Sequence, residues 1–387
     1  MRICVSCFFF LLSHLLFPSP PPLPSKDSVE LYTRNKNSKQ TMSIGEKENN
    51  PNSCAWATLL TSEHLLPGLV VFAHSLLVEH ASQYPLVIMA TSKLSSRARM
   101  ILSKMLPSGK VVIRDIEPIY PASVATGLAY ARFNEVWTKL RAFELVEYQR
   151  VALVDSDMLV RKNMDELFTD PYVFGAKKAE GEEWIGASWA CTCNPNKINT
   201  YPAEWVPENC GFTGQFLPAA SSSATVPQPD ASTPRPGKLI NSGLVILTPS
   251  SSTMDEMIEC INTDPRIPEY RFPDQDFLAD FFSTTTRHIR YLPYKYNALK
   301  KLKLVHPNIW EDAEATNIHY ILDKPWTLGR PGGNANPEGK DADAEIHGWW
   351  WTTFDAVKRA NDETKKGALR LSGVDWKDCV EKYMTLD

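Results

Sequence analysis

The chain contains 387 residues, and 41 lysines and arginines against 45 aspartates and glutamates give it a formal net charge of −4. This near balance argues against a protein that binds nucleic acid through charge, because such proteins carry a basic excess. With 43% hydrophobic and 22% charged residues, the composition is that of a globular protein and excludes a wholly disordered chain. The length suffices for one large α/β domain.

Residues 1–52 form a leader that we expect to be disordered or to act in targeting. An apolar run over 3–17 is shorter than the roughly 20 residues of a membrane span, so no stable span is expected. A proline cluster follows the run instead of a small-residue cleavage site, and basic residues come after it. A cytoplasmic location is therefore favoured. The secretory pathway is the alternative if residues 1–17 act as a signal or anchor.

Short apolar runs alternate with segments of helical spacing in the next part of the chain. Strands are predicted at 55–61, 86–90, 111–114 and 151–154, and helices at 67–80, 95–106 and 135–149. This alternation predicts an α/β fold with a Rossmann-like, mostly parallel central sheet flanked by helices. Such sheets bind ligands at the carboxyl ends of their strands, which directs attention to the residues after 151–154.

The second half of the chain is less regular. Residues 177–216 are predicted to be irregular, and the Ser/Pro-rich stretch 217–238 to be a mobile surface loop inserted into the domain. Further elements are predicted as a strand at 239–247 and helices at 253–262, 274–283 and 350–360. We expect residues 53–387 to fold as a single domain.

The eight cysteines fit no standard zinc-binding pattern. Cys191, Cys193 and Cys210 lie close together in the sequence, which leaves a disulfide or a metal staple open. Buried free thiols in a reducing compartment are the favoured interpretation.

Two carboxylates, Asp155 and Asp157, stand one residue apart directly after the predicted strand 151–154. At this spacing both can turn toward one divalent ion, because carboxylate oxygens are suitable ligands for Mn²⁺ and Mg²⁺. On its own the pattern is more typical of a solvated turn or a helix cap, so the surrounding sequence has to decide.

The surrounding sequence resembles the family 8 glycosyltransferases, the group that contains glycogenin and galactinol synthase. The resemblance runs in order through most of 54–326, and the segments that carry it are Thr138-Lys139-Leu140, VALVDSDMLVRKNMDELF (151–168), YPLVIMATSKLSSRARMILSK (84–104), Asn241-Ser242-Gly243, Asp274-Gln275-Asp276, and His319 with Lys324-Pro325-Trp326. It implies the GT-A fold, a UDP-sugar donor, and retention of configuration at the anomeric carbon.

The resemblance also implies roles for individual residues. Three of them, Asp155, Asp157 and His319, would ligate Mn²⁺, with Mg²⁺ as the alternative ion. Lys324 would contact the leaving diphosphate. The other donor-binding positions would be Leu59, Thr61 and Ser62 around the uridine, together with Lys139, Ser156 and Asn241.

Gln275 takes the position facing the sugar in the family's retaining site, with Asp274 and Asp276 beside it to orient hydroxyl groups. Glutamine is a poor nucleophile. We therefore expect front-side attack through an oxocarbenium-like ion pair, in which the departing diphosphate oxygen deprotonates the acceptor. Lys324 would stabilise that diphosphate, which makes it part of the catalytic set as well.

Three features differ from the family pattern. Only residues 320–323 separate His319 from Lys324, and the family's glycine is missing from this stretch. Leu65 stands where glycogenin-like enzymes have a tyrosine that stacks on uracil, and 217–238 is an insertion. Within the family the chain is closer to galactinol synthase, because 298–310 contains no tyrosine for self-glucosylation.

These observations predict a Mn²⁺-dependent retaining hexosyltransferase. We expect it to transfer a sugar from a UDP-hexose, with UDP-galactose favoured over UDP-glucose, to a small hydroxylated acceptor such as myo-inositol. The alternatives are a non-catalytic UDP-sugar-binding protein and a glycogenin-like self-glucosylating primer. No nucleic-acid partner is expected, and a homodimer remains open.

Overall fold

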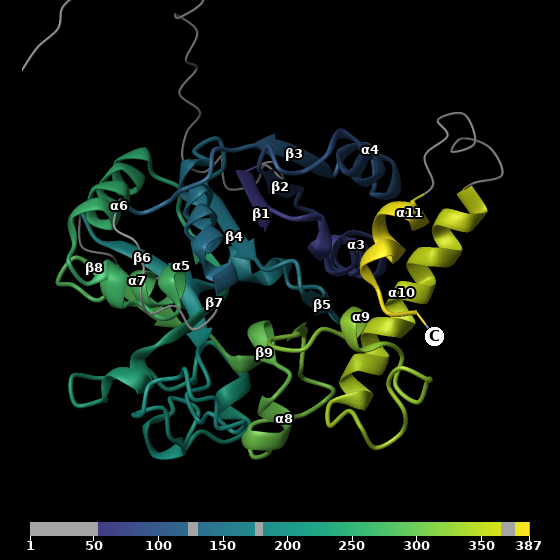
Figure 1. The fold of residues 1–387 in the computed structure, drawn as a ribbon. Coiled ribbons are helices and arrows are strands. Elements are labelled where there is room, and N and C mark those ends of the chain that lie inside the picture. The colour runs from purple at the N-terminus through teal and green to yellow at the C-terminus, as the bar shows by residue number, and fades with distance from the viewer. Residues whose placement is uncertain (1–52, 123–130, 175–180, 365–375, 387) are drawn as a thin grey trace, which may run out of the picture. The chain divides into compact units, whose positions relative to one another are not determined.

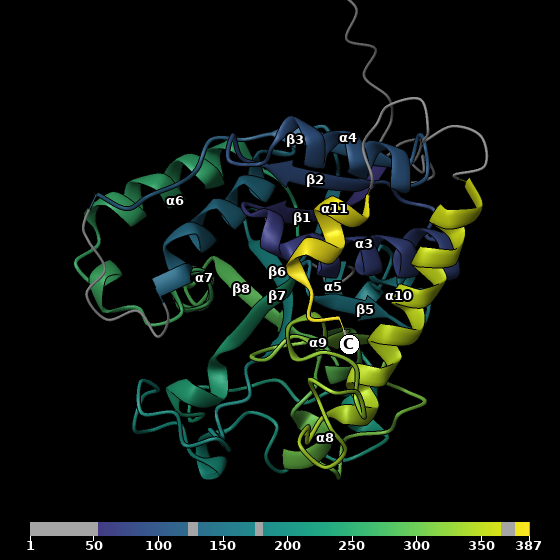
Figure 2. The ribbon, with the colours of Figure 1, turned by 45° about the vertical axis from the view of Figure 1, so that its right-hand side comes forward.

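The computed structural model describes residues 53–122, 131–174, 181–364 and 376–386, so the predictions for the leader lie outside the described residues. All described residues belong to one compact unit, Asn49–Asp387. Figures 1 and 2 show its elements arranged around a central sheet, with α3 and α10 on one side of strands β1 and β4 and with α6 and α7 on the other.

The central sheet has seven strands in the order β3-β2-β1-β4-β7-β6-β8. Their bounds are β1 Cys54–Leu60, β2 Leu86–Ala90, β3 Val111–Asp115, β4 Arg150–Val154, β6 Glu183–Trp189, β7 Ile240–Leu247 and β8 Arg287–Tyr291. Only β7 runs antiparallel to both of its neighbours, β4 and β6, and the other four pairings are parallel. The predicted α/β class with a mostly parallel central sheet between helices is confirmed, and it is the arrangement expected of the GT-A type.

A second, three-stranded sheet in the order β5-β10-β9 lies next to the end of β4. It consists of β5 Met158–Val160, β9 Ala298–Leu299 and β10 Asn317–His319. Its register pairs His319 with Met158 on one side and with Leu299 on the other. Because β5 starts directly after Asp157, this small sheet brings His319 to the two carboxylates that follow β4.

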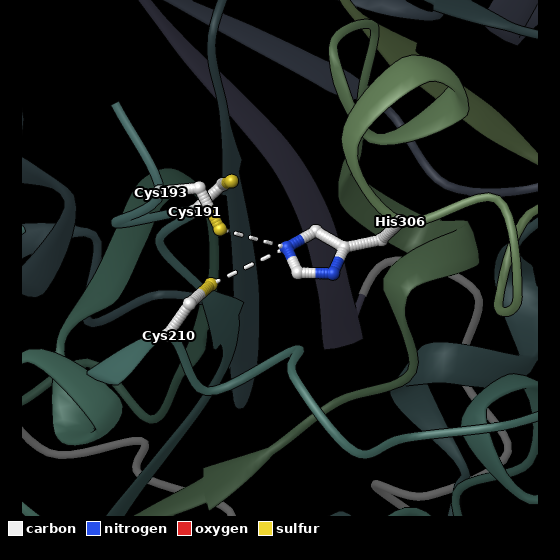
Figure 3. A group of neighbouring side chains, drawn as sticks. All are labelled: Cys191, Cys193, Cys210 and His306. Atoms are coloured by element: carbon white, nitrogen blue, oxygen red, sulfur yellow. Dashed lines mark hydrogen bonds between the residues drawn. The ribbon is translucent and has the colours of Figure 1, made fainter. Parts of the chain in front are cut away.

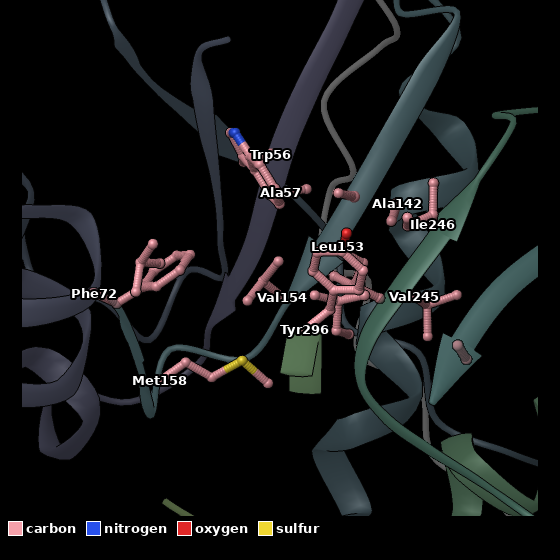
Figure 4. Close-up of a cluster of buried hydrophobic side chains, with 14 of the residues drawn as sticks. Trp56, Ala57, Phe72, Ala142, Leu153, Val154, Met158, Val245, Ile246 and Tyr296 are labelled. Atoms are coloured by element: carbon pink, nitrogen blue, oxygen red, sulfur yellow. The ribbon is translucent and has the colours of Figure 1, made fainter. Parts of the chain in front are cut away.

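The helices cover both faces of the central sheet. The α-helices are α3 Leu66–His74, α4 Ser96–Met105, α5 Pro171–Phe174, α6 Ser251–Thr263, α7 Pro273–Phe281, α8 Leu302–Val305, α9 Pro325–Leu328, α10 Ala344–Thr364 and α11 Lys377–Val380. Figure 4 shows Leu153 and Val154 of β4 between Phe72 of α3 and Ala142, and all four are buried. The apolar runs read from the sequence therefore form the core of the unit.

Three predicted elements differ from the structure. The stretch predicted as an α-helix over 135–149 is instead a 3-10 helix, η5 Ala131–Glu144. Its buried Trp137, Leu140 and Phe143 are spaced by three, which is the repeat of a 3-10 helix. Strand β6 lies inside the supposedly irregular 177–216, and α10 extends beyond the predicted 350–360 at both ends.

The Ser/Pro-rich stretch 217–238 is largely a loop, as predicted, but the loop is attached to the body of the domain. Gln228 holds the last residue of β8 by two bonds: its amide accepts from Tyr291 N at 2.9 Å and donates to Tyr291 O at 3.0 Å. Trp189 donates from Nε1 to the carbonyl of Gly237 at 3.1 Å. Gln228 thus takes the place of a strand partner at the edge of the sheet. The mobility of this loop stays a prediction.

Among the described helices, none combines the length and the apolar character that crossing a membrane requires.

Candidate active site

The turn after β4 is held between two neighbouring strands. The amide of Asp155 donates to the carbonyl of Gly243 in β7 at 2.8 Å, and the carbonyl of Asp157 accepts from the amide of Tyr320 at 3.0 Å. These main-chain bonds fix the turn at the carboxyl end of β4. Both carboxylates of the Asp155-Ser156-Asp157 turn consequently point to one place.

That place also receives the imidazole of His319. Its Nε2 lies 3.3 Å from Asp157 Oδ1 and 3.7 Å from Asp155 Oδ2, and the donor atoms of all three residues lie within 4.8 Å of one another. A Cβ at position 243 would collide with the His319 ring, so only glycine lets the ring approach β7 this closely. Two carboxylate oxygens and one imidazole nitrogen can hold Mn²⁺ or Mg²⁺.

An asparagine that sequence reasoning missed sets the orientation of His319. Asn297 is fully buried, and its Oδ1 lies 2.9 Å from His319 Nδ1. Its Nδ2 donates to Asn241 Oδ1 at 2.9 Å and to Asn241 O at 3.2 Å, which assigns the Asn297 oxygen to the histidine side. His319 Nδ1 therefore carries the proton, and the lone pair of Nε2 faces the carboxylates, as a metal ligand requires.

Two lysines balance the carboxylate charge. Lys139 Nζ lies 2.7 Å from Asp155 and 3.1 Å from Asp274, and Lys324 pairs with Asp157. Burial alone would lower the pKa of Lys139, but the two flanking carboxylates raise it. Burial alone would likewise raise the pKa of Asp157, but the Lys324 ammonium holds it well below its usual range. Lysine and aspartate side chains therefore alternate across the site.

These groups line a cavity of about 210 Å³. Eight of the predicted site residues take part in its lining: Lys139, Asp155, Asp157, Asn241, Asp274, Gln275, His319 and Lys324. Asp274 Oδ2 accepts from the hydroxyl of Ser242 at 2.7 Å, and Gln275 Oε1 accepts from Asn241 Nδ2 at 3.3 Å. The structure thus joins segments distant in the sequence into one polar site.

Five predicted residues do not line this cavity. Asp276 is buried and accepts hydrogen bonds from the amides of Arg271 and Phe272, both at 3.0 Å, so it organises the start of α7. Burial raises the pKa of Asp276 to about 6. The others are Leu59, Thr61 and Ser62 at the carboxyl end of β1, and Ser156 between the two carboxylates that follow β4. Their assignment to the donor stays a prediction.

An aromatic wall and a further lysine complete the lining, and neither was predicted as part of the site. Trp205 stacks on Phe272 with ring centroids 4.9 Å apart, and Tyr201 contacts both rings edge-on. Lys301 reaches the cavity and pairs with Asp343 at 2.7 Å. Isolated aromatic residues give no signal in the sequence, because only folding brings 201–205 next to 272.

The shortened stretch between His319 and Lys324 has an unusual backbone. Leu322, which lines the cavity, has a φ of 62°. This is the left-handed region, where glycine is favoured and leucine is rare. The chain therefore makes this left-handed turn with a leucine that lines the cavity.

Asp341, Asp343 and His347 form another acid–histidine group among the described residues. Lys300 lies 3.3 Å from Asp343 and 2.9 Å from His347 Nε2, and Lys301 also pairs with Asp343. The lysines face Asp343, and Asp341 lies 2.5 Å from His347 Nδ1, so these contacts tie α10 to the segment after β9 without requiring a cation.

No family model matches the chain. Galactinol synthase 1 of Solanum lycopersicum is 28% identical over 304 residues, which cover 77% of this chain and 81% of that protein. Galactinol synthase 5 of Arabidopsis thaliana is 28% identical over 309 residues, covering 76% and 80% of the two chains. Among solved structures, the galactosyltransferase LgtC in complex with donor and acceptor sugar analogs is one to which the chain is similar. That structure has a TM-score of 0.42 and 15% identity, and the match covers 76% of this chain and 95% of that chain.

Proposed function

This chain is a relative of the galactinol synthases, as its family 8 motifs predict, and from that premise we propose that it is a metal-dependent, retaining hexosyltransferase. UDP-galactose is the preferred donor in this proposal, and a polyol such as myo-inositol is the acceptor. The observation that carries the proposal is the meeting of Asp155, Asp157 and His319 with Lys139 and Lys324 in one cavity.

The three potential metal ligands suit a hard divalent ion. Mn²⁺, with Mg²⁺ as the alternative, would be held by Asp155, Asp157 and His319, and Asn297 keeps Nε2 of the histidine free to bind. When bound, the ion would neutralise charge on the donor diphosphate. The carboxylates of Asp155 and Asp157 would repel a diphosphate in the absence of a metal. We therefore expect the cation to bind first and the UDP-sugar second.

The lysines supply the protein's own positive charge. Lys324 Nζ also donates to the carbonyl of Tyr320 at 2.6 Å, which holds the ammonium at the cavity wall. Placed there, Lys324 stabilises the negative charge that develops on the leaving diphosphate. Lys139 lies between Asp155 and Asp274 and can orient the donor from the opposite side.

The residues around Gln275 support front-side attack. The nearby carboxylate of Asp274 is engaged by Lys139 and Ser242, and Gln275 offers an amide that is too weak a nucleophile to form a covalent intermediate. In the proposed step the bond from the anomeric carbon to the diphosphate oxygen breaks. The acceptor hydroxyl bonds to the same face of the sugar, and its proton passes to the departing diphosphate oxygen.

The aromatic wall suits the acceptor. Tyr201, Trp205 and Phe272 offer apolar ring faces against which the CH groups of a cyclic polyol can pack, while nearby polar groups take its hydroxyls. The glycogenin-like alternative is less well supported. Tyr294 and Tyr296, which precede the tyrosine-free stretch 298–310, are only 1% and 3% exposed.

The proposal is tested by offering the full chain UDP-galactose or UDP-glucose with Mn²⁺ and a panel of polyols, sugars and peptides. We expect a galactosylated polyol and stoichiometric UDP. Intact mass is measured in the same reactions, since hexose-sized increments on the protein would instead support a self-glucosylating primer. UDP binding without consumption of either donor would support the non-catalytic alternative and overturn the proposed activity.

A further inference from the structure

Beside the cavity lies a second group of potential ligands, formed by Cys191, Cys193, Cys210 and His306 (Figure 3). Their ligand atoms all lie within 4.8 Å of one another. His306 Nε2 is 3.2 Å from Cys193 Sγ and 3.5 Å from Cys210 Sγ. We propose that these four residues form a structural zinc site of the Cys₃His type, which does not depend on the proposed transferase activity.

The spacing of the ligand atoms fits a tetrahedral ion. Zn–S bonds of about 2.3 Å and Zn–N bonds of about 2.0–2.1 Å place sulfur and nitrogen roughly 3.6 Å apart, and two sulfurs roughly 3.8 Å apart, around one zinc. The two sulfur–nitrogen distances, 3.2 and 3.5 Å, are close to that value. The remaining pairs of ligand atoms lie within 4.8 Å of one another, so coordination would draw the more distant atoms inward by up to about 1 Å.

The four ligands come from three separate places in the fold. Cys191 and Cys193 follow the end of β6, and Cys210 is the residue after the short 3-10 helix η7 Pro207–Asn209. His306 is the residue after α8. Free thiols or a disulfide would need no such convergence, and all three cysteines are free in the structure. A disulfide would also use two sulfurs and leave the third sulfur and His306 without a role.

The donor types indicate zinc rather than the ion of the cavity. Thiolates and imidazole are preferred by zinc, whereas carboxylates suit manganese and magnesium. Three sulfurs and one nitrogen fill a tetrahedral shell and leave no position for a substrate, which is typical of a structural site. Cys193, Cys210 and His306 are 7%, 4% and 5% exposed, whereas Cys191 is partly exposed and lines the active-site cavity, so three of the four ligands are shielded from solvent.

The site would hold the wall of the active-site cavity. Tyr201 and Trp205 line that cavity and lie in the sequence between Cys191 and Cys210, in a segment built mainly of turns. A zinc ion joins both ends of this segment to His306, and thereby supplies the rigidity that regular secondary structure would otherwise give. Binding deprotonates the thiols, and their protons are released to solvent.

The test is the metal content of the full chain, expressed with added zinc, dialysed, and measured by mass spectrometry of the elements. We expect about one zinc per chain. Cys210→Ser should lower the zinc content by at least about fivefold, because one of four ligands is lost. Cys260→Ser is the matched control, since Cys260 is also a free cysteine but lies outside the group; it should keep its zinc.

A readout on the wild-type chain covers the case in which Cys210→Ser does not fold. Titration with an organomercurial in the presence of a zinc-sensitive dye should release the zinc as Cys191, Cys193 and Cys210 are modified, as located by peptide mass mapping. Hydrogen exchange of 191–210 should rise when the zinc leaves. Wild-type protein without zinc, or zinc retained after all three thiols are modified, would overturn the proposal.

Discussion

Two groups of potential metal ligands lie near one cavity, and they differ in chemistry and in access. Asp155, Asp157 and His319 offer oxygen and nitrogen, and the carboxylate side chains are 23% and 14% exposed. The cysteine group offers mainly sulfur, and Cys210 and His306 are almost fully buried. Three ligands of the first group would leave coordination positions for a substrate, whereas the four ligands of the second group would fill the shell of a tetrahedral ion. The comparison teaches that donor type and access, rather than the number of donors, separate a catalytic metal site from a structural one.

The largest effect is expected from Asp157→Ala, which removes a ligand from the open group. Turnover should fall by about a thousandfold or more, because the metal supplies several kcal/mol of transition-state stabilisation. The measurement is UDP release against Mn²⁺ concentration. Asp115→Ala, which removes a highly exposed carboxylate at the end of β3, is the control and should keep full activity. Full activity of Asp157→Ala would remove this residue from the metal site.

Asn297→Ala should weaken the open group indirectly. Without the hydrogen bond to His319 Nδ1, neither the orientation of the ring nor the position of its proton is fixed. Residues that hold a metal-binding histidine in this way typically contribute about 10–100-fold to metal affinity. Titration of Mn²⁺ followed by electron paramagnetic resonance measures this directly. Asn297 would have a merely structural role if its variant lost thermal stability but bound Mn²⁺ as tightly as the wild type.

Cys210→Ser should affect the cysteine group and leave Mn²⁺ binding by Asp155, Asp157 and His319 nearly unchanged. It should lower the melting temperature by several degrees, since a variant that loses a structural metal ligand loses folding free energy. Its Mn²⁺ affinity should nevertheless remain within about threefold of wild type, because the open group shares no ligand with the closed one. A Mn²⁺ affinity that collapses together with the zinc content would show that the two groups act as one.

The smallest effect concerns Asp276, which the structure places behind the cavity. Its folded-state pKa of about 6 is raised by burial, so the folded protein holds this proton more tightly than the unfolded chain. Burial of Asp276 therefore does not reduce the free energy of unfolding below about pH 4, where the group is protonated in both states. As the pH rises through 6, the free energy of unfolding falls by about 1–3 kcal/mol. Asp276→Asn can still accept from Arg271 and Phe272, and it should remove this loss. Denaturant unfolding of both proteins at pH 4 and pH 7 measures the difference.

Much of the fold could be predicted because its signals are local. The run LVIMA over 86–90 is apolar throughout and is β2 to the residue. Strand β6 could not be found this way. Its sequence EWIGASW has no regular alternation, and it becomes a strand only by pairing with β7 and β8, far along the chain. The strands of the small sheet are two or three residues long, too short for any pattern.

The site residues likewise fall into those found from local motifs and those placed only by long-range contacts. Asp155, Asp157, His319 and Lys324 were predicted because they stand in motifs, and the structure brings them together. No role was predicted for Asn297, because its role depends on a bond to His319, 22 positions away. His306 is 96 positions from Cys210, so the sequence does not reveal it as a fourth ligand. Without that ligand, free thiols were the favoured interpretation of the three cysteines. Contacts of this range are properties of the fold and not of any local pattern.

The central claim is that the cavity binds a UDP-sugar through a metal held by Asp155, Asp157 and His319. Calorimetric titration of UDP into the dialysed full chain, with and without added Mn²⁺, tests it most directly. We predict UDP binding that requires Mn²⁺ in the wild type and is absent in Asp157→Ala. Equal UDP binding with and without the ion, or no UDP binding under either condition, would contradict the account.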